Sequence, residues 1–123
     1  MNRERKLPTG SIIPLTNVHF KSGTTELVST ESYAVLKDLA IYLKSYPIIA
    51  IRINGYTDSK GSEASNLSLS KRRARYIAKK IIEHGVSKNR IKWKGFGDKN
   101  PIASNEQEEG RLKNRRVEFE VIE

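Results

Sequence analysis

Residues 48–85 read IIAIRINGYTDSKGSEASNLSLSKRRARYIAKKIIEHG, in which a strand pattern is followed by a long helix pattern. Residues 48–55 are rich in β-branched side chains that alternate with smaller or polar ones, which predicts a strand with one face buried more deeply. Residues 65–84 carry apolar side chains at helical spacing, and Gly85 is placed to end that helix. The predicted core face of the helix consists of Leu67, Ala74, Ile77, Ala78, Ile81 and Ile82.

The sequence on both sides of this stretch continues the alternation of strand and helix. Residues 30–46 have apolar side chains at helical spacing and are followed by Pro47, which predicts another amphipathic helix, the first in chain order. Residues 98–114 are polar and predict a long loop with room for one helical turn. Three further strands are predicted at residues 15–20, 91–97 and 117–121. The order β-α-β-α-β-β predicts an α+β fold, an α/β sandwich with two helices packed on one face of a mixed four-stranded sheet.

The length of 123 residues is that of one domain. We expect a flexible basic tail or linker at residues 1–14 and a globular domain at residues 15–123. Residues 1–8 lack the apolar run of a secretory signal, so the chain is either cytoplasmic or a mature piece of a longer exported protein. No window has the ~20 apolar residues of a membrane-spanning helix. The absence of cysteine excludes disulfides, thiolate metal sites and cysteine nucleophiles.

The charge balance points to an acidic partner. The chain has 23 Lys and Arg against 14 Asp and Glu, a net charge of +9. Residues 71–99 hold 11 of the basic residues and 2 of the acidic ones, so the whole excess is local. Such a field attracts nucleic acid, an anionic membrane surface or another acidic polymer.

Asp58 and Arg73 are the strongest candidates for a ligand site. Asp58 follows the C-terminal end of a predicted central strand, where ligands gather in α/β folds. Asn66, Leu69 and Arg73 share one stripe of the second helix, beside its core face. Such a pair would suit a zwitterionic ligand. The Asp58 carboxylate would bind the ammonium of the ligand, and the Arg73 guanidinium would bind its carboxylate through two hydrogen bonds. The alternative is that Asp58 is a turn or cap residue and Arg73 a solvated charge.

A set of motifs resembles the OmpA-like C-terminal domain family over residues 15–122, essentially the whole globular part. That family includes domains of OmpA porins, of the peptidoglycan-associated lipoprotein and of the stator protein MotB. The motifs, in the order and approximate spacing of the family, are Gly55-Tyr56-Thr57-Asp58, Gly61, Asn66, Leu69-Ser70, Arg73-Ala74, Gly85, Gly95-Phe96-Gly97, Pro101, Gly110-Arg111 and Asn114-Arg115-Arg116-Val117-Glu118.

The resemblance implies a periplasmic, non-catalytic module without a cofactor or metal. Such a module anchors an envelope or outer-membrane protein to peptidoglycan by binding the diaminopimelate of the stem peptide. Asp58 matches the family acid that contacts diaminopimelate, and Arg73 matches the arginine that pairs with its carboxylate. The other implied ligand-binding positions are Thr57, Asn66 and Leu69 in the groove, Phe20 as a wall, and Arg115 and Arg116 as secondary candidates. The chain departs from the pattern at Lys21, where many relatives carry an aspartate.

Nucleic-acid binding is the alternative function. Residues 94–97 match the first four positions of the RNA-recognition octapeptide, but Asp98, Lys99 and Pro101 break the match. The stacking platform of that module is therefore missing, and we expect no specific nucleic-acid partner.

Enzymatic and membrane functions are also not expected. His19 and His84 are far apart and have no metal-ligand spacing, and Asp58 and Glu63 share one loop instead of flanking a cleft as glycosidase carboxylates do. The apolar stripe of the second helix is needed for the core, so we expect no insertion into a membrane.

Overall fold

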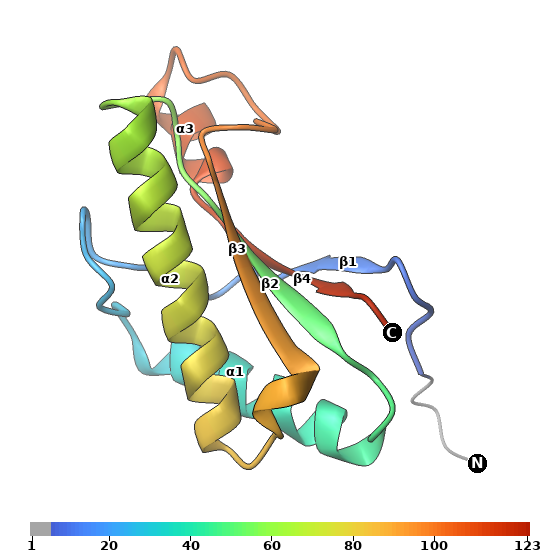
Figure 1. The fold of residues 1–123 in the computed structure, drawn as a ribbon. Helices are drawn as coiled ribbons and strands as arrows, with labels where there is room; N and C mark the ends of the chain where they lie inside the picture. Colours follow the sequence, from blue (N-terminus) through green and yellow to red (C-terminus); the bar gives the residue numbers. More distant parts are fainter. Residues whose placement is uncertain (1–5) are drawn as a thin grey trace.

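The structure is a computed structural model that describes residues 6–123 (Figure 1). The elements in chain order are β1 (Ile12–Pro14), α1 (Thr30–Ser45), β2 (Ile51–Tyr56), α2 (Glu63–Glu83), the 3-10 turn η1 (Lys88–Arg90), β3 (Ile91–Gly97), α3 (Glu108–Asn114) and β4 (Val117–Val121). The predicted α+β fold is confirmed.

The four strands form one mixed sheet in the order β1-β4-β2-β3. β4 runs antiparallel to both β1 and β2, whereas β2 and β3 are parallel. The parallel pair requires a crossover, which α2 provides (Figure 1). The C-terminal ends of β2 and β3 therefore lie at the same edge of the sheet, beside the start of α2.

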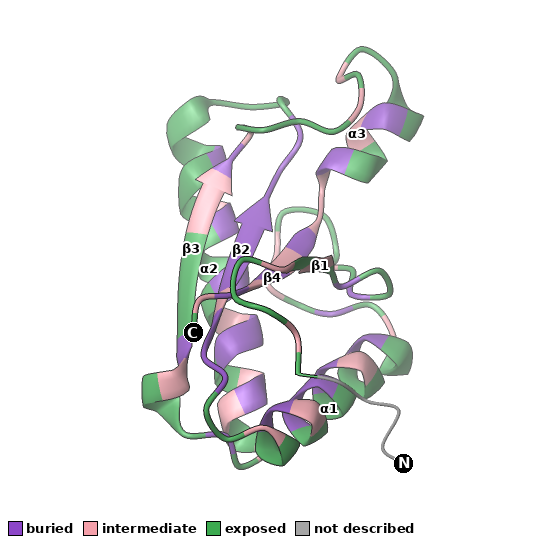
Figure 2. Ribbon diagram, turned by 90° about the vertical axis from the view of Figure 1, so that its right-hand side faces the viewer, coloured by how far each residue is buried: buried purple, intermediate pink, exposed green. Residues whose placement is uncertain are grey.

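One hydrophobic core lies between the sheet and the two long helices. Leu36 and Leu43 of α1, Ile77 and Ile81 of α2 and Ile53 of β2 are fully buried members of it. Figure 2 shows β2 buried along its length, whereas the middle of β3, at the edge of the sheet, is exposed. The central position of β2 fixes the point from which the following loop departs.

The first strand differs from the prediction. Of the predicted tail, residues 1–5 lie outside the described residues, but Ile12–Pro14 forms β1 and pairs with β4. The predicted strand at residues 15–20 is instead a turn that leads to an isolated bridge between Phe20 and Leu27. Pro14 was expected to end the tail, yet β1 is an edge strand, where the missing N–H of proline is tolerated.

The core face of α2 also differs from the prediction at its first turns. Leu67 is 47% exposed, whereas Asn66, Ser70 and Arg73 are buried. The reason lies in β3, because Gly95 and Gly97 lack side chains and the backbone of α2 at Leu67 and neighbouring residues packs directly on them. That close approach leaves no room for a large apolar side chain between the first turns of α2 and β3.

Residues 98–114 also differ from the prediction. The expected long loop contains a helix, α3, whose bounds are Glu108–Asn114. Acidic residues stand in its first turn and basic residues in its last, which complements the helix dipole. α3 lies at the same end of the molecule as the loop after β2 (Figure 1).

Candidate functional site

A groove of about 560 Å³ opens between four parts of the chain. They are the loop after β2, the side of α2 that carries Asn66, Leu69 and Arg73, helix α3, and residues 18–23. It is only partly enclosed and has both polar and apolar walls. All of the residues predicted for the site line it: Phe20, Thr57, Asp58, Asn66, Leu69, Arg73, Arg115 and Arg116. The structure thus brings together residues that the sequence separates by almost a hundred positions.

Asp58 is a buried carboxylate with a fixed orientation. It follows β2 in the loop before α2, and 7% of the residue is exposed. Its Oδ1 accepts a hydrogen bond from the backbone N–H of Lys60 at 2.9 Å, and its Oδ2 accepts one from Nη1 of Arg115 at 2.6 Å. A carboxylate has further lone-pair positions, so Asp58 can accept an additional donor from a ligand.

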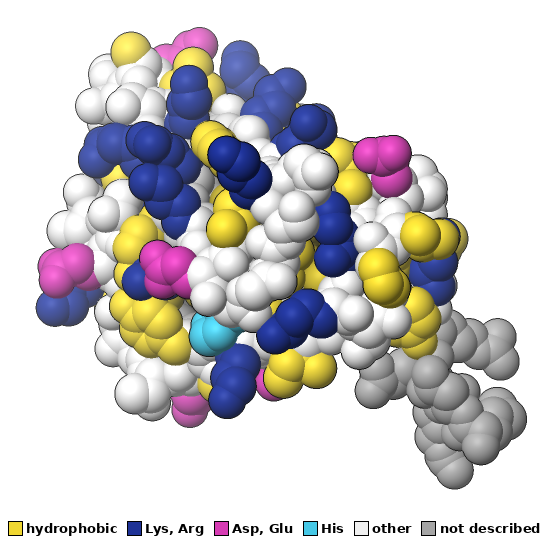
Figure 3. Space-filling model, turned by 60° about the horizontal axis from the view of Figure 1, so that its bottom comes forward, with side chains coloured by type: hydrophobic (Ala, Val, Ile, Leu, Met, Phe, Trp, Pro, Cys, Tyr) yellow, Lys and Arg dark blue, Asp and Glu magenta, His cyan; other side chains and the backbone are white. Residues whose placement is uncertain are grey.

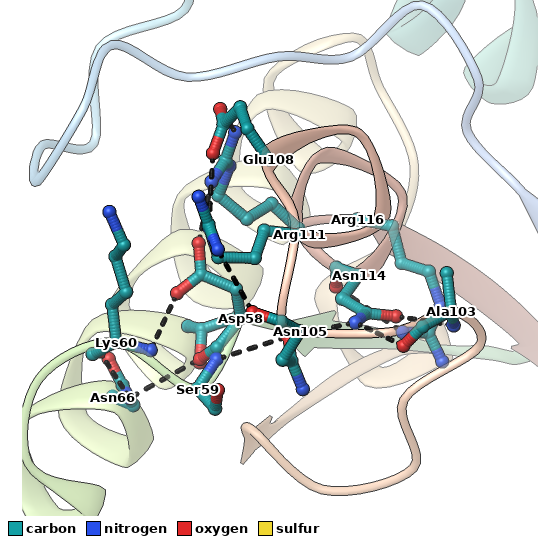
Figure 4. A network of polar contacts seen from close by, with 12 residues as sticks. Asp58, Ser59, Lys60, Asn66, Ala103, Asn105, Glu108, Arg111, Asn114 and Arg116 are labelled. Atoms are coloured by element: carbon teal, nitrogen blue, oxygen red, sulfur yellow. Dashed lines mark hydrogen bonds and ion pairs between the residues drawn. The ribbon is translucent and has the colours of Figure 1, made fainter.

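Thr57 and Asn66 both bind the backbone carbonyl of Asp58. The Thr57 hydroxyl donates to the carbonyl of Asp58 at 2.8 Å. The Asn66 side-chain amide donates to the carbonyls of Asp58 and Lys60, at 3.3 and 2.9 Å (Figure 4). Asn66 therefore meets Asp58 as predicted, but through the main chain. Its amide stabilises the turn that presents the carboxylate.

Arg73 reaches the groove from the second turn after Asn66 on α2. It is 8% exposed, and its guanidinium lies 4.9 Å from the centre of the Phe20 ring. Its Nε donates to the carbonyl of Thr24 at 2.8 Å and its Nη2 to the carbonyl of Lys21 at 3.2 Å. The outer end of the guanidinium, with the N–H groups of Nη1, is left to bind a carboxylate.

The surroundings of Arg73 disfavour its positive charge. Burial lowers the pKa of Arg73 from its ordinary value, the positive charges of Arg115 and Arg72 lower it further, and Asp58 opposes them. The arginine still carries its charge at neutral pH, because a guanidinium keeps its proton in proteins. A buried cation held among other cations gains from an anionic ligand.

Arg115 joins Asp58 to a residue that the sequence did not reveal. Its Nη2 donates to Glu108 of α3 at 2.7 Å, while Nη1 holds Asp58. The hydrogen bond to Glu108, opposed by burial and supported by Asp58, raises the pKa of Arg115. We call Asp58, Arg115 and Glu108 the ion triad. Glu108 precedes Arg115 by two turns, but its helix was expected to be a loop, so no periodicity pointed to it.

The ion triad makes the titration of Glu108 a test of the site's geometry. The hydrogen bond from Arg115, followed by that from Arg111, outweighs burial and lowers the pKa of Glu108 below its ordinary value of 4.5. A lowered pKa in the folded state contributes stability above pH 4.5 that is lost as the pH falls through the folded-state value. NMR titration of the Glu108 carboxyl should give a midpoint below 4.5 that moves upward in Arg115→Gln. An unchanged midpoint in that variant would mean that Arg115 does not hold Glu108.

The neighbouring Arg116 has a different role. Its guanidinium lies 3.8 Å from the centre of the Tyr56 ring and its Nε donates to Glu118 at 2.9 Å. It also donates to the carbonyls of Asn114 and Asn100. Arg116 lines the groove, but these contacts tie its charge to the sheet and the loop after β3. Arg115 is the one whose charge meets Asp58.

A buried asparagine connects α3 to the loop that carries Asp58. Asn114 is fully buried, accepts hydrogen bonds from the backbone of Ile102 and Ala103, and donates to Asn105 at 2.9 Å. Asn105 in turn accepts a hydrogen bond from the backbone N–H of Ser59 at 3.3 Å. Figure 4 shows this chain of polar contacts running from α3 to the turn beside Asp58. These hydrogen bonds fix the position of α3 relative to the loop after β2.

The basic excess of residues 71–99 lies mostly outside the groove. The structure describes this whole stretch, and Arg73 is its only basic residue in the groove lining. The backbone of Lys71 packs against Gly95 of β3, while Lys92 and Lys94 are exposed on that edge strand. On the face shown in Figure 3, Lys and Arg side chains gather in groups with few acidic side chains between them. The excess is therefore mostly a charged surface outside the groove.

Within residues 6–123 there is no cluster of three or more His, Asp or Glu residues that could hold a metal ion. None of the helices in the same part of the chain is long and apolar enough to cross a membrane.

Comparison with known proteins defines the class of this domain. The model of the OmpA family matches residues 19–115, and the chain belongs to this family. The resemblance carried by the sequence motifs is thus confirmed.

Relatives in several bacteria share this region. The peptidoglycan-binding protein ArfA of Mycobacterium tuberculosis is 47% identical over 89 residues, which are 72% of this chain and 27% of ArfA. The probable lipoprotein YiaD of Escherichia coli is 43% identical over 103 residues, which are 84% of this chain and 47% of YiaD. The chain therefore spans less than half the length of either relative.

Solved structures share the fold. The periplasmic domain of MotB from Helicobacter pylori superimposes with a TM-score of 0.78 at 27% identity, covering 94% of this chain and 75% of that one. The peptidoglycan-associated lipoprotein of Burkholderia pseudomallei gives a TM-score of 0.75 at 28% identity, covering 89% of this chain and 88% of the other.

Proposed function

We propose that this domain binds peptidoglycan noncovalently through the diaminopimelate of the stem peptide and so anchors an envelope protein to the cell wall. The observation that carries the proposal is that Asp58 and Arg73, opposite in charge and both buried, line one groove. The free end of the diaminopimelate side chain carries an ammonium and a carboxylate on one carbon. Asp58 would accept the ammonium, and the outer end of the Arg73 guanidinium would grip the carboxylate.

The contacts around these two residues support a preformed site. The Asp58 carboxylate is held by Lys60 and Arg115, and Arg73 is held by two backbone carbonyls and the Phe20 ring. Side chains locked in this way lose little conformational entropy when a ligand binds. Leu69 offers an apolar wall for the methylene chain of diaminopimelate.

The names of the relatives support peptidoglycan as the ligand and the cell envelope as the location. ArfA is named a peptidoglycan-binding protein, and the lipoprotein whose structure matches is peptidoglycan-associated. Relatives in the family also include outer-membrane proteins, among them porin F of Pseudomonas aeruginosa and outer membrane protein A of Bordetella avium. We therefore place the function of this domain in the periplasm, as a binding part of a larger envelope protein.

The same geometry favours binding over catalysis. Asp58 and Glu108 both form ion pairs with Arg115, so neither is set apart as the protonated acid that glycoside hydrolysis requires.

The glycine pattern that resembles an RNA-recognition motif is explained by packing, because Gly95 and Gly97 allow the backbone of α2 to approach β3 closely. Phe96 is stacked on Tyr56 with ring centres 5.0 Å apart.

Co-sedimentation with purified sacculi tests the proposal. We expect the domain to sediment with intact sacculi and to be released by a soluble muropeptide that contains diaminopimelate. Glycan strands whose stem peptides have been removed by an amidase should not retain it, because the recognised group is in the peptide. Binding should persist at salt concentrations that release the domain from DNA, since charge–phosphate contacts weaken steeply with salt.

Two outcomes of this assay would contradict the proposal. Equal retention on amidase-treated strands would place recognition on the sugars. Release from sacculi and from DNA at the same salt concentration would mean that the binding is only the nonspecific attraction of a chain with a net charge of +9.

A further inference from the structure

A second hollow of about 320 Å³ adjoins the groove on the side of α3, and its lining is predominantly apolar. Leu15 and Val18 contribute buried side chains to it, whereas Ile102 and Leu112 are 62% and 55% exposed. We call this hollow the apolar annex. Its size falls in the ~300–1,000 Å³ range of small-ligand pockets.

The annex is continuous with the groove. Both hollows share the following lining residues: Val18, His19, Leu112, Arg115, Arg116 and Val117. Arg115, which holds Asp58, thus stands between the proposed diaminopimelate site and the annex. A ligand with an extended backbone bound at Asp58 and Arg73 can continue into the annex without leaving the surface.

We propose that the annex receives the D-alanine that follows diaminopimelate in a tetrapeptide stem, an inference that rests on the proposed function. Diaminopimelate has two neighbours in the stem, a glutamate that carries a carboxylate and an alanine that carries a methyl group. The predominantly apolar lining matches the methyl group, because burial of apolar surface is favourable. Lys113 lines the annex and does not line the groove, and its ammonium would pair with the terminal carboxylate of the alanine.

Exposed apolar side chains support this assignment. Scattered ones are normal on protein surfaces, but Ile102 and Leu112 come from the loop after β3 and from α3 and line the same hollow. The Asn114 side chain, which accepts from the backbone of Ile102, holds that loop in place. The annex is therefore formed before the ligand arrives.

The affinities of a tripeptide and a tetrapeptide test the inference. The tripeptide is L-alanyl-γ-D-glutamyl-diaminopimelate, and the tetrapeptide adds D-alanine; isothermal titration measures both. We expect the tetrapeptide to bind the wild type about fourfold more tightly, which corresponds to burial of one methyl group. Ile102→Ser should remove this gain and leave the tripeptide affinity unchanged, because Ile102 lines the annex and not the groove. Ile48→Ser, at a 71% exposed isoleucine before β2, is the matched control and should keep the gain.

Each other outcome has a defined meaning. Failure of the wild type to bind the tripeptide contradicts the proposed function itself. Binding of both peptides with equal affinity, or a gain that Ile102→Ser retains, overturns the annex assignment alone. If Ile102→Ser instead removes a gain produced by adding N-acetylmuramic acid to the tripeptide, the annex takes the sugar and the assignment to alanine is wrong.

Discussion

Asp58→Asn is expected to weaken binding of the diaminopimelate tripeptide by at least about tenfold. A hydrogen bond to a charged group is typically worth ~1.5–3 kcal/mol, and the variant removes the charge that would accept the ligand's ammonium. The asparagine keeps an oxygen that can accept from the backbone of Lys60. Arg115 keeps Glu108 as its partner, so the charge left behind is not orphaned. The loss should therefore appear in affinity, measured by isothermal titration, with little change in the fold.

Asp98→Asn is the matched control for this prediction. Asp98 follows β3 at the same end of the sheet but does not line the groove. We expect wild-type affinity for this variant. If both variants bind alike, Asp58 is only the turn residue that the alternative interpretation of the sequence describes. Circular dichroism of Asp58→Asn distinguishes a lost contact from a lost fold.

Gly95→Ala is expected to destabilise the fold by about 3 kcal/mol. A Cβ atom at this position would lie 2.6 Å from Cα of Lys71, which is backbone of α2 and cannot rotate away. The helix would have to move off β3. Because α2 carries Asn66 and Arg73, that movement would also disturb the groove. Urea denaturation followed by circular dichroism measures the free energy of unfolding.

Lys92→Ala tests whether the effect belongs to the helix contact. Lys92 lies on the same strand, and its side chain is exposed, so its removal should change the free energy of unfolding by less than about 0.5 kcal/mol. A Gly95→Ala variant as stable as Lys92→Ala would show that α2 does not approach β3 as closely as the structure has it.

The order of helices and strands could be predicted because long periodic segments report burial directly. The periodicity failed where a packing cause overrode it. Leu67 matches the apolar stripe of α2, yet the glycines of β3 bring the helix backbone so close that Asn66 and Ser70 turn inward. β1 was missed because three residues ending in proline carry almost no strand signal.

The site residues were predicted largely from the family resemblance, and their arrangement came from the fold. Spacing along α2 put Asn66 and Arg73 on one stripe, and both line the groove. Sequence could not show that Asn66 binds backbone carbonyls or that Arg73 holds residues 21–24. Glu108 was missed for a different reason, since its pairing with Arg115 depends on a short helix that lacks a clear apolar period.

The most direct test of the central claim compares two tripeptides that differ at one carbon. One contains diaminopimelate and the other contains lysine, which keeps the ammonium and lacks the side-chain carboxylate. Because Arg73 is proposed to grip that carboxylate, we predict saturable binding of the diaminopimelate peptide and at least about tenfold weaker binding of the lysine peptide. Equal affinities for the two peptides would contradict the account, because recognition would then not involve the carboxylate that Arg73 is proposed to grip.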